Sequence, residues 1–145
     1  MEKDNFSAKQ KKGKTKMYKE IIVCILVVIL IFSMDLLSNN YTKKVFFSIN
    51  DSLGNLRNEM LKENKDVNKI NDEIKKVEQE WNEKLNLLSC YIEHNELEKV
   101  DTEIVKAKAD IEVQNYAIAI ENLERCTFIL EHIKDKNSLK IVNVF

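Results

Sequence analysis

The sequence predicts an all-α protein, with an N-terminal transmembrane helix followed by an antiparallel up-down helical bundle of about four helices. The 145 residues include no Pro and only two Gly, and a β-rich chain of this length would need more turn residues. Twelve apolar residues follow one another near the N-terminus, and from about residue 41 apolar residues recur at helical spacing. We therefore divide the chain into a basic tail at 1–20, a transmembrane helix at 21–37 and a helical bundle at 41–145.

The basic tail predicts the orientation of the chain. Residues 1–20 carry seven Lys against three acidic residues, a net charge of +4, while residues 21–145 carry 16 basic and 21 acidic residues, a net charge of −5. Lysine-rich flanks stay on the cytoplasmic side of a membrane and are attracted to anionic lipid. We expect a single-pass protein of the cell membrane, with the N-terminus cytoplasmic and the C-terminal domain outside. Nucleic-acid binding is the weaker alternative because no folded module adjoins the run.

The apolar run can be read as an uncleaved anchor, a cleaved signal peptide or the core helix of a soluble bundle. Twelve helical residues span only about 18 Å, which suits a signal peptide better than a bilayer core of about 30 Å. However, Met34, Leu36 and Leu37 extend the run, no pair of small residues suits cleavage, and Tyr18 and Tyr41 frame it where aromatic belts form. A soluble helix would show one apolar stripe only. We therefore predict an anchor, formed by Ile21, Ile22, Val23, Cys24, Ile25, Leu26, Val27, Val28, Ile29, Leu30, Ile31 and Phe32.

The first two amphipathic helices are predicted on either side of the sequence "KENKD". Asp66 is the expected N-cap of the second helix, because Asp favours that position. The two apolar stripes are Phe46, Ile49, Leu53, Leu56 and Met60, then Val67, Ile70, Ile74, Val77, Trp81, Leu85, Leu88 and Ile92.

The last two helices complete the predicted bundle. Asn95 with Glu98 three residues later resembles a capping box, and Asn115 is a candidate cap for the fourth helix. The stripes are Leu97, Val100, Ile104, Ala107 and Ile111, then Ala119, Leu123, Cys126, Leu130 and Ile133. Short connections between amphipathic helices favour antiparallel neighbours.

Three short stretches carry a resemblance to a known family: Trp81, "YIEHNELEKVD" and the final "NVF". With these the chain resembles a family of small uncharacterised single-pass membrane proteins of spore-forming Gram-positive bacteria, defined by a domain of unknown function. The resemblance implies a transmembrane helix followed by a helical domain, and it implies no activity. The matching residues are Trp81, His94, Asn95, Glu96, Leu97, Asn143, Val144 and Phe145, with Leu97 standing where Ile is more frequent.

No pattern for catalysis or cofactor binding is present. The sequence has neither a nucleophile elbow nor a Gly-rich phosphate loop, so we expect no enzyme and no cofactor. His94 and His132 could meet beside Glu93 or Glu131, but zinc needs three or four convergent ligands. We therefore expect no metal site and interpret "HNE" as a capped turn. Trp81 is expected to pack between helices.

The last prediction from the sequence concerns the role of the protein. We expect a membrane-anchored binding or structural interaction module at the cell envelope, of unknown biochemical activity. One alternative is a coiled-coil subunit of envelope assembly or cell division, which would form if the first two stripes joined into one helix. Another is a ligand-sensing bundle that acts through a partner. The sequence leaves the partner protein and the oligomeric state open.

Overall fold

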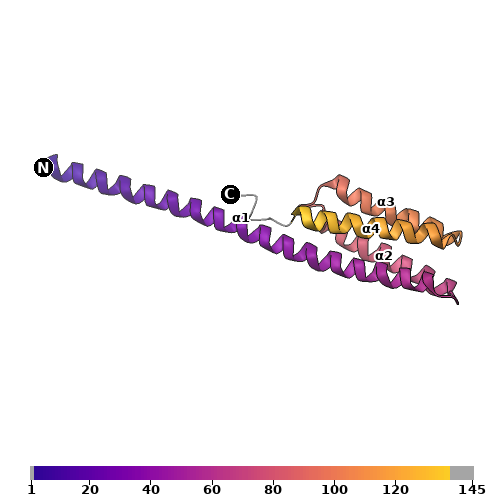
Figure 1. The fold of residues 1–145 in the computed structure, drawn as a ribbon. Coiled ribbons are helices and arrows are strands. Elements are labelled where there is room, and N and C mark those ends of the chain that lie inside the picture. Colours follow the sequence, from indigo (N-terminus) through magenta and orange to yellow (C-terminus); the bar gives the residue numbers. More distant parts are fainter. Residues whose placement is uncertain (1, 138–145) are drawn as a thin grey trace. The chain divides into compact units, whose positions relative to one another are not determined.

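The protein is all-helical throughout the residues that the structure describes, as the sequence predicts. The computed structural model describes the backbone of residues 2–137 and the side chains of residues 18–136. These residues contain four helices and no strand: α1 (Glu2–Leu61), α2 (Val67–Leu88), α3 (His94–Glu112) and α4 (Tyr116–Asn137), as labelled in Figure 1. The chain divides into two units, Met1–Ser38 and Asn39–Phe145.

The first unit holds the apolar run. Every residue from Ile21 to Phe32 is exposed, and α1 contains an 18-residue window of mean hydropathy 2.9. This helix is long and apolar enough to cross a membrane, a criterion that a signal sequence also meets. The core helix of a soluble protein would be mostly buried, whereas no part of the window is.

The expected break between the membrane segment and the first amphipathic helix is absent. We expected one helix to end at Leu37 and another to begin near Tyr41, but α1 continues from Glu2 to Leu61. No Pro or Gly lies between Gly13 and Gly54 to interrupt it. The polar side chain of Ser38 does not compete with the helix, because its hydroxyl donates to the carbonyl of Asp35 at 3.0 Å.

The second unit is built on one apolar core, to which all four predicted stripes contribute. Three stripes are buried completely, and the second is buried except at two residues: Val67 is 38% exposed and Leu85 is half-buried. The prediction for Val67 was wrong because this residue begins α2 at the turn, where no neighbouring helix covers it. Val45 joins the core although no stripe included it.

Polar contacts between helices connect positions that are numbered in opposite order along the two helices. Rising residue numbers in one helix therefore meet falling numbers in its neighbour. Between α1 and α2, with the residues that follow α2, the pairs are Glu59–Lys69, Ser52–Glu80 and Thr42–Tyr91. Between α1 and α4 they are Arg57–Glu124 and Asn50–Glu131. Between α3, with the residue before it, and α4 they are Asp110–Asn122 and Glu93–Lys136.

Two of the three expected helix starts are where the sequence places them. Asp66 is the N-cap of α2, and its carboxylate accepts a hydrogen bond from the backbone N–H of Lys69 at 3.1 Å. Asn115 directly precedes α4, and its carbonyl accepts from the N–H of Ala119 at 3.0 Å. The preceding residue, Gln114, has φ 58°, the left-handed conformation that reverses the chain after α3.

The predicted cap at Asn95 is wrong. The N-cap of α3 is Glu93, whose carbonyl accepts the N–H groups of Glu96 and Leu97, and its side chain makes no capping hydrogen bond. Asn95 therefore lies inside the first turn. The burial of Ile92 and Leu97 on either side of this start fixes where the chain turns into the core, and it overrides the local capping preference.

Candidate functional site

The residues of "HNEL" lie where the start of α3 meets the end of α4. His94 and Asn95 are exposed and Leu97 is buried in the core. The ammonium group of Lys136 lies 3.1 Å from the carboxylate of Glu93 and 3.6 Å from that of Glu96. Burial opposes ionisation of Glu96, but Lys99 and Lys136 outweigh it and lower the pKa of this carboxyl. These contacts hold two helix ends together.

Trp81 lies on α2 and belongs to the apolar core, with its side chain fully buried. Its indole N–H has no hydrogen-bond partner among the described residues. The apolar packing of this residue therefore stabilises the fold, and its one unpaired donor lowers that gain. The other matching residues, Asn143, Val144 and Phe145, lie outside the described residues.

The described side chains do not assemble a metal site. No group of three or more His, Cys, Asp or Glu residues in that part of the chain is placed to hold an ion. His94 and His132 are both exposed, on α3 and α4 respectively.

The three cysteines are free thiols in different environments. Cys24 and Cys90 are exposed, and Cys126 is buried in the core. Burial, with the charge of Glu103 nearby, raises the pKa of the Cys126 thiol to about 12. Because the thiolate is the reactive form, Cys126 is unreactive at neutral pH and Cys90 is the accessible thiol of the second unit.

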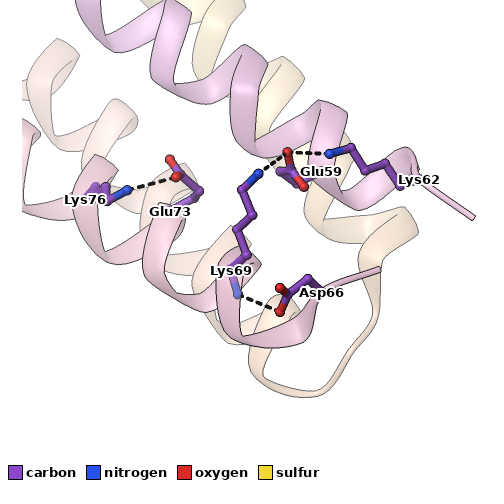
Figure 2. A network of polar contacts seen from close by, with 6 residues as sticks. All are labelled: Glu59, Lys62, Asp66, Lys69, Glu73 and Lys76. Carbon is purple, nitrogen blue, oxygen red and sulfur yellow. Dashed lines mark hydrogen bonds and ion pairs between the residues drawn. The ribbon is translucent and has the colours of Figure 1, made fainter. Parts of the chain in front are cut away.

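A network of ion pairs lies at the turn between α1 and α2, as Figure 2 shows. The carboxylate of Glu59 accepts hydrogen bonds from the ammonium groups of Lys62 and Lys69, both at 2.7 Å. These bonds lower the pKa of Glu59. The lysines are exposed, so each pair contributes little energy and the network serves chiefly to define the turn.

A groove with apolar rims lies between α1 and α4 on the described surface. It consists of two hollows that share Asn50 and Glu131. Lys43 and Phe47 line the hollow nearer the end of α4, while Gly54 and Phe128 line the other. We call these two hollows together the α1–α4 groove.

The α1–α4 groove combines exposed aromatic rings with an unfilled floor. Phe47 is 77% exposed and Phe128 is 73% exposed, one on each helix. A Cβ atom added at Gly54 would meet nothing within 4 Å, so this part of the floor is open. Solvent-exposed rings beside a hollow are typical of protein interaction surfaces.

The groove also contains an unpaired hydrogen-bond acceptor. The side-chain amide of Asn50 donates to Glu131 Oε1 at 3.1 Å, but its buried oxygen Oδ1 accepts no hydrogen bond from the described residues. A buried acceptor of this kind is costly when unpaired. This oxygen is closed to solvent, so the exposed binding features of the groove are its aromatic rims.

The sequence pattern does not predict the two exposed rims of the groove. Phe47 and Phe128 are large apolar residues that fall outside their helices' buried stripes, and this was the available signal. The fold determines which helices lie next to each other. It therefore also determines which two residues outside the buried stripes share a groove.

The described residues form an all-helical protein with an N-terminal helix that is long and apolar enough to cross a membrane and a groove with exposed aromatic rims between α1 and α4. The family model "Domain of unknown function (DUF4363)" matches residues 36–144, and the chain belongs to this family. The predicted relation to a domain of unknown function is thereby confirmed. No curated protein and no solved structure matches the chain.

Proposed function

We propose that this protein is a single-pass membrane protein whose helical domain binds a partner at the outer side of the cell membrane. The observation that carries the proposal is the exposed apolar run of α1, which precedes a domain with a complete core of its own. Exposed apolar surface costs about 25 cal/mol per Å² in water, and lipid removes that cost. The lysine-rich residues before the run favour a cytoplasmic N-terminus.

The domain in this proposal is an antiparallel up-down bundle formed by the second part of α1 with α2, α3 and α4. The oppositely numbered polar pairs between these helices support it. The break at residues 62–66 counts against the coiled-coil alternative, because it prevents the first two stripes from forming one helix.

A binding role is favoured over catalysis by the character of the α1–α4 groove. Its rims are Phe47 and Phe128, and its buried polar group is an amide oxygen of Asn50. The exposed rings can hold an apolar segment, whereas neither the rings nor the amide supplies a nucleophile with an adjacent base.

The native thiols allow a direct test of the proposed topology. An impermeant maleimide added to intact cells should label Cys90, which is exposed, and leave Cys126 unmodified, because it is buried and protonated. The protein should also remain in the membrane fraction after an alkaline wash, with an intact mass that includes the apolar run.

The matched control reports on the other side of the membrane. The variant Ser7→Cys in a Cys90→Ser background should be labelled only after permeabilisation. Labelling of Ser7→Cys in intact cells, or a mature N-terminus that begins after the apolar run, would contradict the proposal.

A further inference from the structure

We propose that one end of the second unit, the end that holds its first residues, binds the headgroups of anionic lipid at the membrane surface. The inference rests on the membrane anchoring proposed above and adds a lipid partner to it. The residues that form this surface lie on α1 and at the turn after α2, and we call them the entry surface: Lys43, Lys44, Leu87, Cys90 and Tyr91.

A contact within the second unit brings the turn after α2 to the first residues of the unit. The hydroxyl of Thr42 donates to the hydroxyl oxygen of Tyr91 at 3.3 Å, although the two residues are 49 positions apart. Cys90 belongs to the same turn, because its backbone N–H donates to the carbonyl of Leu87 at 3.2 Å. The side chains after α2 therefore lie at the end of the unit where the chain enters it.

The length of the chain keeps this end close to the membrane. The second unit begins at Asn39, and the extended apolar run ends at Leu37. Thr42 is five residues beyond Leu37, and five residues span at most about 18 Å even when they are fully extended. The headgroup layer adds about 5–7 Å on each side of the hydrocarbon core. Once the run crosses a membrane, the entry surface is thus confined near the headgroups.

Lys43 and Lys44 bring positive charge to the entry surface. Both are exposed, and neither forms an ion pair with a described residue. Glu93, which follows Tyr91 at the same turn, is paired instead with the ammonium group of Lys136 at 3.1 Å. Unpaired lysines close to a bilayer are attracted to anionic headgroups, so the two lysines favour a lipid partner of negative charge.

The apolar members of the entry surface suit the same partner. Leu87, Cys90 and Tyr91 are all exposed to solvent in a domain that has a complete core without them. Tyrosine rings favour the level of the headgroups, where one end of the ring is apolar and the other is wet. A side chain such as Leu87 leaves water when it enters that layer, which is favourable.

The opposite end of the second unit provides an internal comparison. The ammonium group of Lys65 lies 6.0 Å from the centre of the Tyr116 ring, so the α1–α2 turn and the start of α4 share that end. Val113, in the turn between α3 and α4, is exposed there. Because the chain does not hold this end near the apolar run, we expect lipid contact at Cys90 and none at Val113.

The test measures quenching of a fluorophore on Cys90 by lipids that carry a nitroxide on the headgroup. The full-length protein with Cys24→Ser is labelled and reconstituted into vesicles of phosphatidylcholine, alone or mixed with phosphatidylglycerol. Quenching at Cys90 should be several-fold greater in the mixed vesicles. The same fluorophore on Val113→Cys, in a chain that also carries Cys90→Ser, should be quenched weakly in both. Equal quenching at Cys90 in the two lipids, or equal quenching at the two positions, would overturn the proposal.

Two pairs of neighbouring lysines provide a matched charge control. Lys43→Gln with Lys44→Gln should remove the effect of phosphatidylglycerol on quenching at Cys90. Lys75→Gln with Lys76→Gln removes the same charge from exposed positions of α2 and should leave the effect unchanged. If both pairs lower the quenching equally, the entry surface does not recognise anionic lipid.

A second variant tests the surface without changing a residue of the α1–α4 groove, which Lys43 also lines. Leu87 is 49% exposed, and Leu87→Glu places a negative charge against the headgroups. This variant should reduce quenching at Cys90 several-fold, whereas Val105→Glu, at a position of α3 that is 52% exposed, should not. Unchanged quenching in Leu87→Glu would overturn the proposal.

Flotation of the vesicles separates this inference from the proposed anchoring. Chains that float with the vesicles but do not respond to phosphatidylglycerol would overturn the entry surface and leave the anchor standing. Chains that do not float would overturn the anchor, and the inference that rests on it would fall with it.

Discussion

At the scale of single residues, the period of the apolar side chains predicts nearly the whole core but not its polar members. Glu103 and Asn122 are buried beside the stripes of α3 and α4. Lys106 donates to Glu103 at 2.7 Å, and Asn122 donates to Asp110 at 2.8 Å. A pattern of apolar residues gives no weight to polar ones, and their burial depends on partners that only the fold brings close.

Trp81 provides the clearest residue-scale prediction. Trp81→Ala should lower the free energy of unfolding by about 3–5 kcal/mol, because it leaves a large cavity in the core. Trp81→Phe should cost less than about 1.5 kcal/mol, because the ring still fills most of the site and the unpaired indole N–H is removed. Urea unfolding of both variants measures the difference. A cost for Trp81→Phe close to that of Trp81→Ala would show that the N–H has a partner in solution.

At the scale of helices, the sequence predicts a helix start correctly where a capping side chain sets it. The prediction fails where the burial of apolar residues sets the start instead. Asp66 caps α2 as expected, whereas the start of α3 is set by the burial of Ile92 and Leu97 rather than by Asn95. The continuity of α1 was missed for a related reason. The change from an apolar run to a stripe marks a change of surroundings, and it need not mark a helix end.

The two candidate caps give a matched pair of substitutions. Asp66→Ala should lower the free energy of unfolding by about 1 kcal/mol, because the backbone N–H of Lys69 loses its acceptor. Asn95→Ala should change it by less than about 0.5 kcal/mol, because Asn95 is exposed inside the first turn of α3. Thermal or urea unfolding checks both. A loss of about 1 kcal/mol for Asn95→Ala would show that its side chain caps the helix after all.

At the scale of the whole molecule, the number of helices near the core could be predicted, but the groove between α1 and α4 could not. Stripe positions determine which face of a helix is buried, and they do not say which two helices adjoin. The pairs Asn50–Glu131 and Arg57–Glu124 supply that information. Only with this neighbour relation do Phe47 and Phe128, far apart in the sequence, become two rims of one surface.

The continuous core of the second unit predicts that it unfolds as one domain. A fragment of residues 39–145 should be helical by circular dichroism and should melt in one cooperative transition, because all four stripes share a single apolar cluster. Its melting temperature should not change with protein concentration, since no second chain is needed to cover the core. The coiled-coil alternative makes the opposite prediction, because a dimer is stabilised by mass action and would scatter as a rod. A melting temperature that rises with concentration, together with rod-like scattering, would therefore favour the coiled coil over the bundle.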